Sequence, residues 1–182
     1  MTITKGGDMD DKQRLGALEV ALNNEMNERE FYLNHARRTR NPVGRAMFNQ
    51  IADDELEHYQ RLKDLHGKWE KNHKWPETIP LTVKQTNVKM ILKDVIRKAA
   101  EMPEADDDDL KAIEIATKFE AKGAELYTGL SNASMDPREK AFFALLAGIE
   151  REHYLSLKDT EEYLKDPSSW FTKKEHHGLD GA

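Results

Sequence analysis

Six ionisable residues stand at positions where helical periodicity places core residues: Glu25, Glu55, His58, Glu120, Glu150 and His153. Apolar residues at spacings of three, four and seven precede each glutamate, as Leu15, Leu18 and Leu22 precede Glu25. Four carboxylates buried together lose much hydration free energy unless cations neutralise them. Two divalent metal ions would balance four negative charges, and glutamate oxygens with histidine nitrogens suit iron or manganese.

The same arrangement occurs twice, at an offset of 95 residues and without a gap. Glu55-Leu-Glu-His58 corresponds to Glu150-Arg-Glu-His153, and each pair follows an inward glutamate by 30 residues. Other matched positions are Leu15 and Leu110, Tyr32 and Tyr127, Pro42 and Pro137, Phe48 and Phe143, and Leu62 and Leu157. A single Glu-x-x-His is common on helices, so the repetition is what favours a two-metal site. The alternative is a duplicated bundle whose core is emptied of metal or merely polar.

Two copies of a helical hairpin account for the repeat. The expected helices cover residues 11–40, 42–65, 108–132 and 137–165. Asn41-Pro42 and Asp136-Pro137 each place an N-cap side chain before a proline at the first helical position. Such short connections make the two helices of a hairpin antiparallel neighbours. The prediction is an all-α, up-down four-helix bundle.

The remaining segments connect or extend this bundle. Residues 1–11 are expected to be a flexible N-terminus, and the bundle spans 12–165, with hairpins at 12–66 and 107–165. Residues 67–106 would cross over along the bundle, and the stripe from Val88 to Ala99 predicts a short amphipathic helix there. In the C-terminal tail, 166–182, Trp170 and Phe171 are candidates to dock on the bundle, and 174–182 would be frayed.

Composition narrows the function. The 182 residues contain no cysteine, which excludes disulfides, a zinc ribbon, a rubredoxin-type iron centre and a thiol nucleophile. A net charge of −6 disfavours nucleic acid as a partner. Apolar runs fall short of the roughly 20 residues that span a bilayer, and the polar, acidic first residues do not resemble a signal peptide. We therefore expect a cytoplasmic protein without a membrane partner.

Four motifs together resemble the rubrerythrin family and, more broadly, ferritin-like di-iron proteins: Glu25-x6-Tyr32, Glu55-Leu-Glu-His58, Glu120-x6-Tyr127 and Glu150-Arg-Glu-His153. The resemblance covers about residues 12–165. It implies a ferritin-like bundle with one crossover and a di-iron carboxylate site, in which one glutamate from each of two helices joins a Glu-x-x-His from each of the others. The family's iron ligands would fall on the six residues named first.

The resemblance also implies cofactors and partners. Two iron ions per chain, with manganese or zinc as possible substitutes, would react with hydrogen peroxide or dioxygen, and an external electron donor such as rubredoxin would restore them. Tyr32 and Tyr127 would donate hydrogen bonds to ligand carboxylates, which orients the ligands; their alternative role is to fill the core. We expect a homo-oligomer, with a dimer favoured.

Two departures from the family pattern bear on activity. Full-length rubrerythrins carry a rubredoxin-like domain with four cysteines, and this chain has none. They also use an extra glutamate three residues after the ligand of the third helix, where this chain has Gly123, while the matched position in the first helix is Glu28. Glu28 could supply a carboxylate as a seventh ligand from the opposite side, or it could be a solvated helix charge.

Three functions follow from these observations. The first is a peroxidase-like redox enzyme, in which metal chemistry does the work and the protein holds open coordination positions. The second is iron oxidation and storage, as in ferritins. The third is a non-enzymatic, metal-stabilised scaffold. The fold alone does not decide among these three functions. The pronounced duplication and the middle insert favour the rubrerythrin type of redox protein.

Overall fold

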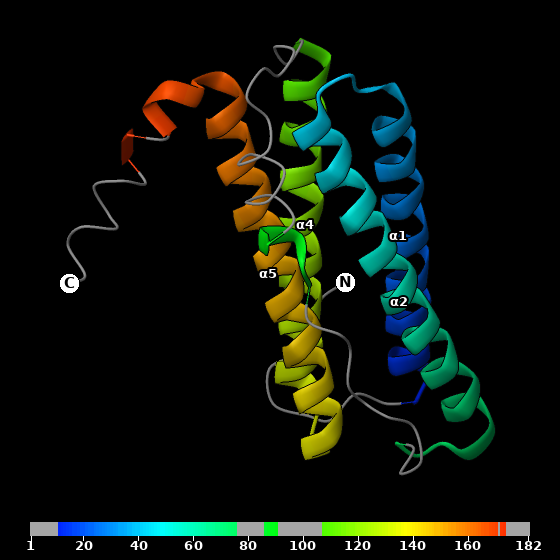
Figure 1. Cartoon of the computed structure of the whole chain (residues 1–182). Coiled ribbons are helices and arrows are strands. Elements are labelled where there is room, and N and C mark those ends of the chain that lie inside the picture. The colour runs from blue at the N-terminus through cyan, green and yellow to red at the C-terminus, as the bar shows by residue number, and fades with distance from the viewer. Residues whose placement is uncertain (1–10, 76–85, 91–106, 171, 174–182) are drawn as a thin grey trace.

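The computed structural model describes residues 11–75, 86–90, 107–170 and 172–173, and the regular structure in these ranges is helical. Four long helices form the bundle: α1 (Asp11–Arg38), α2 (Pro42–Asn72), α4 (Asp107–Ala133) and α5 (Pro137–Lys165). Within each hairpin the helices are antiparallel, and α2 and α4 run in the same direction, as a crossover requires (Figure 1). This confirms the predicted all-α, ferritin-like bundle.

The predicted caps begin the second helix of each hairpin. The side chain of Asn41 accepts hydrogen bonds from the backbone N–H groups of Val43 and Gly44, at 2.9 and 3.2 Å. Asp136 accepts in the same way from Arg138 N–H at 2.8 Å. Each cap satisfies backbone donors that the first turn of a helix leaves unpaired. The cap and the following proline explain why each hairpin turns where it does.

One helix is longer than its periodicity predicted. We expected the second helix to end near Leu65, but α2 continues to Asn72 and ends at His73, whose φ of 50° is left-handed. Trp69 is buried in the last turns, and the Arg14 guanidinium lies 4.4 Å from the centre of its ring. Packing on Trp69 therefore extends the helix beyond the leucine stripe, and the first proline after it is Pro76.

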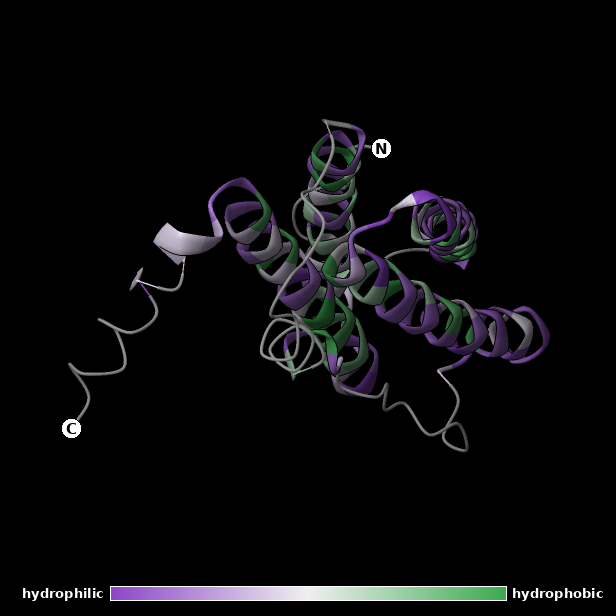
Figure 2. Ribbon diagram, turned by 45° about the horizontal axis from the view of Figure 1, so that its top comes forward, coloured by the Kyte–Doolittle hydropathy of each residue, from purple (hydrophilic) through white to green (hydrophobic). Residues whose placement is uncertain are grey.

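The apolar core consists of two clusters, one toward each end of the bundle. One cluster includes Phe48, Ile51 and Ile113, and the other includes Leu62 and Phe143. The four inward glutamates lie between these clusters along the helices. Figure 2 shows hydrophobic segments toward the middle of the bundle and hydrophilic ones toward the outside. The acidic residues thus sit in a layer enclosed by apolar packing at both ends.

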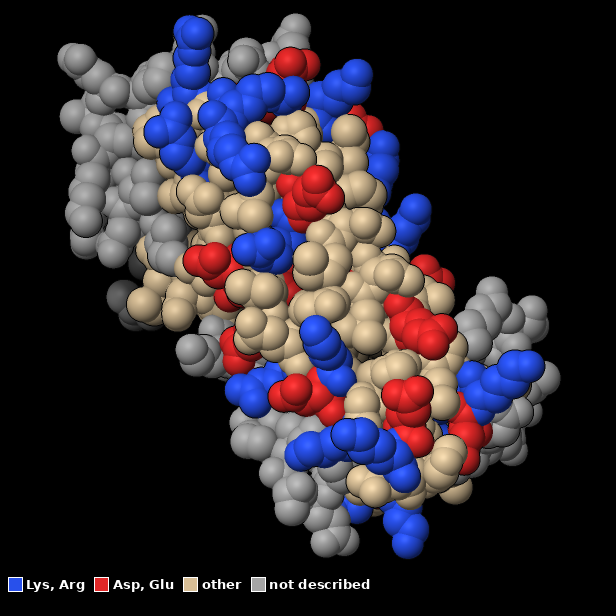
Figure 3. Space-filling model, turned by 90° about the vertical axis from the view of Figure 1, so that its right-hand side faces the viewer, with Lys and Arg blue, Asp and Glu red and all other residues tan. Residues whose placement is uncertain are grey.

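The outer faces carry charges of both signs. Figure 3, which views the side of the molecule where α1 and α2 lie, shows acidic and basic side chains interspersed over this face. Elsewhere, successive helix turns are joined by exposed ion pairs such as Lys118–Glu114, 2.7 Å apart. In the part of the chain that the structure describes, no helix is both long and apolar enough to cross a membrane.

The connecting and terminal segments are described only in part. Val88 is buried and starts the short helical stretch 88–90, whereas the rest of the predicted crossover helix lies outside the described residues. In the tail, Trp170 packs edge-on against Tyr163 and donates from Nε1 to Asp159 at 2.9 Å. The predicted docking of Trp170 is therefore confirmed, while Phe171, residues 174–182 and most of the N-terminus lie outside the described ranges.

Candidate metal centre

The structure brings the six predicted residues together in the middle of the bundle. Each of the four helices contributes: α1 supplies Glu25, α4 supplies Glu120, and α2 and α5 each supply one Glu-x-x-His pair. All six residues are at most 2% exposed. Residues three apart are neighbours on a helix surface, so each Glu-x-x-His pair points both side chains at the same point.

The six residues form two groups of four that overlap. The first group is Glu25, Glu55, His58 and Glu150, and the second is Glu55, Glu120, Glu150 and His153. In each group, one ligand atom per residue lies within 4.8 Å of all the others. Glu55 and Glu150 belong to both groups, so two adjacent cations could share these carboxylates.

Both histidines present the same ring nitrogen to the carboxylates. The Nδ1 of His58 lies 3.1 Å from Glu25, 3.0 Å from Glu55 and 3.3 Å from Glu150. The two imidazole rings stack with centroids 6.0 Å apart. Because Nδ1 faces inward, each Nε2 is free to contact groups outside the centre.

His153, in the other hairpin, repeats this geometry. Its Nδ1 lies 3.4 Å from Glu55, 3.3 Å from Glu120 and 3.9 Å from Glu150. The two sets of distances are related by the same internal symmetry as the sequence. Each histidine could therefore serve one of two neighbouring cations.

Two tyrosines connect the hairpins at this level. The hydroxyl of Tyr32 on α1 donates to Glu120 Oε1 on α4, and the hydroxyl of Tyr127 on α4 donates to Glu25 Oε1 on α1. Both phenols are essentially buried. The tyrosines therefore hydrogen bond to candidate ligand carboxylates, as the resemblance implied, in addition to filling the core.

Burial changes the proton affinities of these groups. Loss of hydration raises the pKa of Glu25 to about 8, against the effect of nearby His58, and it also raises the pKa of Glu150 well above its usual value. Burial opposes ionisation of Glu55 too, but the imidazoles of His153 and His58, whose Nδ1 atoms lie 3.4 and 3.0 Å from its carboxylate, outweigh this effect and lower the pKa of Glu55. Without a cation, the centre must therefore hold protons in place of metal charge.

A cation fits the atoms that the centre leaves unpaired. Among the described residues, six buried atoms of these side chains have no hydrogen-bond partner. One is His58 Nε2, on the outer side of its ring, and the other five are Glu55 Oε1, Glu120 Oε2, Glu150 Oε1 and Oε2, and His153 Nδ1. Unpaired buried acceptors are costly, and these converge from three helices. Oxygen and imidazole donors in this number match the preferences of iron, manganese or zinc.

One further carboxylate escaped sequence reasoning. Asp54 accepts a hydrogen bond from His153 Nε2 at 3.0 Å, and the same oxygen accepts from Thr86 Oγ1 at 2.5 Å. Its other oxygen accepts from Gln50 Nε2 at 2.9 Å. The available signal was the residue before each Glu-x-x-His: it is acidic at Asp54 and apolar at its repeat partner, Ile149.

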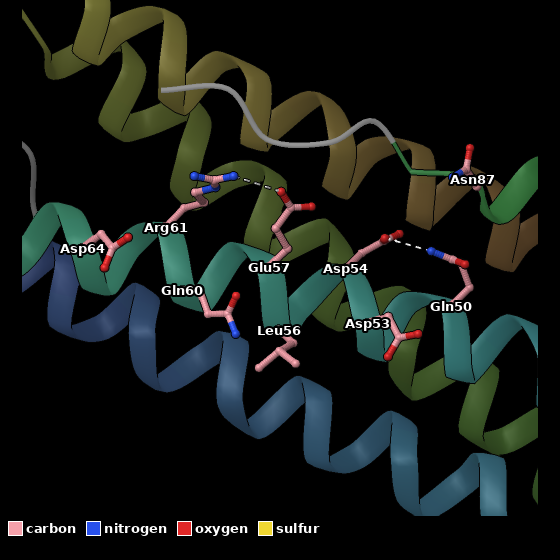
Figure 4. Close-up of a pocket in the computed structure, with 9 residues that line it drawn as sticks. All are labelled: Gln50, Asp53, Asp54, Leu56, Glu57, Gln60, Arg61, Asp64 and Asn87. Atoms are coloured by element: carbon pink, nitrogen blue, oxygen red, sulfur yellow. Dashed lines mark hydrogen bonds and ion pairs between the residues drawn. The ribbon is translucent and has the colours of Figure 1, made fainter. Parts of the chain in front are cut away.

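Asp54 also lines a surface pocket on α2. The pocket has a volume of about 510 Å³, and its polar lining includes Gln50, Glu57, Arg61 and Asn87 (Figure 4). Asp54 is 13% exposed, whereas His153 is fully buried. The buried centre is therefore one hydrogen bond away from a pocket on the surface.

Comparison with known families agrees with this geometry. The family model for rubrerythrin matches residues 16–161, which include most of both hairpins and all six inward residues. The chain belongs to the rubrerythrin family. No curated protein and no solved structure gives a significant match. Membership of the rubrerythrin family, together with the two buried Glu/His groups, supports a di-iron carboxylate protein.

The second departure from the rubrerythrin pattern involves Glu28 and Gly123, one in each hairpin. Glu28 is only 9% exposed, so its interpretation as a solvated helix charge is wrong. Burial, and then the charge of Glu55, raises the pKa of Glu28 to about 10. At Gly123, an added Cβ would lie 3.3 Å from Cγ and Oε2 of Glu150. The glycine therefore leaves room for a shared carboxylate where the family pattern places an extra glutamate.

Proposed function

We propose that this protein is a di-iron oxidoreductase that reduces hydrogen peroxide or dioxygen with electrons from a separate donor. The overlap of the two groups at Glu55 and Glu150 is the observation that carries the proposal. Glu55 and Glu150 could each serve two neighbouring cations, and two metal ions in one centre would supply the two electrons that reduction of one O–O bond needs. Four carboxylates also balance the charge of two divalent ions.

Some of the proposed ligands would serve one metal ion and others would serve both. Glu25 and His58 would hold one iron, Glu120 and His153 would hold the other, and the shared glutamates would bridge them. Manganese or zinc could occupy the same donors. Glu28 is a candidate for a seventh ligand, because its side chain is buried on the same face of α1 as Glu25, one turn away.

Bound as ferrous ions, the two metals would supply two electrons to the O–O bond. The protein's own contribution is positioning and exclusion. Tyr32 and Tyr127 hold one oxygen each of Glu120 and Glu25, and the apolar clusters at both ends keep bulk water from the centre. The chain has no cysteine for a rubredoxin-type centre, so an external donor such as rubredoxin would return the electrons.

Two measurements test this proposal. The first is the metal content of iron-loaded protein, which we expect to reach about two ions per chain and to fall sharply in a variant with Glu55→Ala and Glu150→Ala. Glu57→Ala is the matched control, because Glu57 lies on α2 between the ligands but lines the surface pocket. A loaded content below about one ion per chain contradicts the proposal.

The second measurement is rapid mixing of anaerobic ferrous protein with hydrogen peroxide. We expect one round of oxidation alone and repeated turnover after rubredoxin and a reductase are added. If the ferrous protein does not react with peroxide but oxidises and retains many irons per chain under oxygen, it is a storage protein. If it reacts in neither assay, it is a metal-stabilised scaffold.

A further inference from the structure

The two hairpins differ at two positions next to the metal centre, and both differences have the same direction. The first hairpin has acidic residues at Glu28 and Asp54, and the second hairpin has Gly123 and Ile149 at the matched positions. The candidate ligands and the two tyrosines are themselves matched by the repeat. These two acids are therefore the carboxylates that could make the two metal positions unequal.

Asp54 acts on one histidine only. It accepts the Nε2–H of His153 at 3.0 Å, which leaves Nδ1 of this ring as the metal-facing nitrogen. A carboxylate on the outer nitrogen fixes the tautomer and the ring orientation and makes the inner nitrogen a stronger ligand. The Nε2 of His58, by contrast, has no hydrogen-bond partner among the described residues. Ile149, which matches Asp54 in the repeat, cannot accept a hydrogen bond.

Glu28 is the second acid without a match in the other hairpin. It is buried on α1, one turn after Glu25. The matched residue of α4 is Gly123, which has no side chain, so only the first hairpin adds a carboxylate at this position.

We propose that the two metal positions are unequal, and that the position formed by Glu120 and His153 with the shared glutamates binds a divalent cation first and more tightly. Asp54 is the positioning residue for this difference, since it acts through His153. The position formed by Glu25 and His58 is the weaker one, which fills second. This inference rests on the proposed two-metal site.

The test is a titration of the metal-free full-length chain with Co²⁺, in which calorimetry and visible absorption monitor binding. We expect two binding steps whose dissociation constants differ by about 10-fold or more. His153→Ala should remove the tight step and leave the weak one, and His58→Ala should do the reverse. Asp54→Ala should weaken the tight step by about 10- to 100-fold, the usual effect of removing such an outer partner, and leave the other step unchanged.

Matched variants separate positioning from general damage. Asp54→Asn keeps an acceptor oxygen for His153, so its loss should be smaller than that of Asp54→Ala. Asp53→Ala removes the neighbouring, exposed acid and should change neither step. Circular dichroism of each metal-free variant checks that the helices are intact.

Three results would overturn the inference. They are two steps of equal affinity, loss of the tight step in His58→Ala rather than in His153→Ala, and equal weakening of both steps by Asp54→Ala. Each of these leaves the two-metal site itself standing. Absence of any cobalt uptake would overturn the proposed function as well, so the two failures are distinguishable.

Discussion

The hydroxyl of Tyr32 donates a hydrogen bond to Oε1 of Glu120, a residue 88 positions further along the chain and in the other hairpin. Tyr127 makes the mirror-image bond to Glu25, 102 positions away. Each phenol is buried between apolar neighbours and ends on a carboxylate oxygen. These two bonds connect α1 and α4 at the level of the metal centre.

Replacement of either tyrosine by phenylalanine should destabilise the metal-free protein. Tyr32→Phe keeps the ring but leaves Glu120 without this donor, and loss of one partner of a buried polar group costs about 1–3 kcal/mol. Tyr127→Phe should have a similar effect through Glu25. Urea unfolding measures both, with Tyr154→Phe, at a half-buried position on α5, as the control. Changes below about 0.5 kcal/mol in both variants would mean that the rings only fill the core.

The metal-free protein should become less stable as the pH rises from about 5 to 8. Burial raises the pKa of Glu25 from 4.5 to about 8 and that of Glu28 from 4.5 to about 10. In this range the folded protein binds more protons than the unfolded chain, so the free energy of unfolding falls with increasing pH. His58 and His153 act in the same direction above pH 6.5. Burial lowers their pKa values, but the surrounding carboxylates have the larger effect, so the net pKa of each histidine is raised.

The opposite behaviour is expected of Glu55 at lower pH. Its folded pKa lies below 4.5, so its stabilising contribution is present above that pH and is lost only as the pH falls further. Thermal unfolding at pH 5.5, 6.5 and 7.5 therefore isolates the raised groups. A variant with Glu25→Gln and Glu28→Gln should show a shallower slope. A melting temperature that rises with pH in the metal-free wild type would contradict a clustered carboxylate core.

Two glycines should respond differently to alanine. An added Cβ at Gly148 meets nothing within 4 Å, so Gly148→Ala should stabilise α5 by about 0.5–1 kcal/mol through helix propensity. At Gly123 the Cβ would press on Glu150, so Gly123→Ala should give no such gain and should weaken metal binding. Urea unfolding and cobalt titration measure the two effects. An equal gain in both variants, with unchanged metal binding, would show that Glu150 moves away freely.

A buried ion pair should matter at the far end of α1. Arg14 donates from Nε to Glu139 Oε1 at 2.6 Å and from a terminal nitrogen to Oε2 at 3.2 Å, and both side chains are at most 6% exposed. Removal of one partner of such a pair typically costs about 3–5 kcal/mol. Arg14→Leu should therefore lower the unfolding free energy by this order.

The double variant tests the electrostatic part of that loss. With Arg14→Leu and Glu139→Leu together, no uncompensated carboxylate remains, so stability should recover above that of Arg14→Leu alone. Arg14→Lys keeps the charge but cannot make the bidentate contact, so its unfolding free energy should lie between those of wild type and Arg14→Leu. This account would be contradicted if the double variant lost more unfolding free energy than the two single variants lose together.

The bundle and the six central residues were predictable from the sequence because their signals are local. Helical spacing fixes which face of a helix is buried, and the repeat shows that Glu25 and Glu120 share that face. Asn41 and Asp136 mark helix starts through bonds to residues only two or three positions away. Such features do not depend on how the two hairpins pack together.

The features that escaped prediction depend on contacts between helices. Asp54 looks like one of several acids on α2, and only the approach of α5 brings His153 to it. The same is true of Arg14 and Glu139, which are 125 residues apart. α2 is longer than predicted because Trp69, one turn beyond Leu65, continues the buried stripe: it joins the apolar cluster of Leu62 and Leu65 and contacts Arg14 on α1. Glu28 was ambiguous because its burial depends on the opposite hairpin.

The links that cross between hairpins also bear on the order of folding. Each hairpin turns within a few residues at Asn41 or Asp136, whereas the bonds from Tyr32 and Tyr127 close chain segments of 88 and 102 residues. Long closures lose more chain entropy and slow the step that forms them. We therefore expect the two hairpins to acquire protected amides before the carboxylate layer is assembled. Pulsed hydrogen exchange during refolding would time the helix amides, and recovery of metal binding would time the layer.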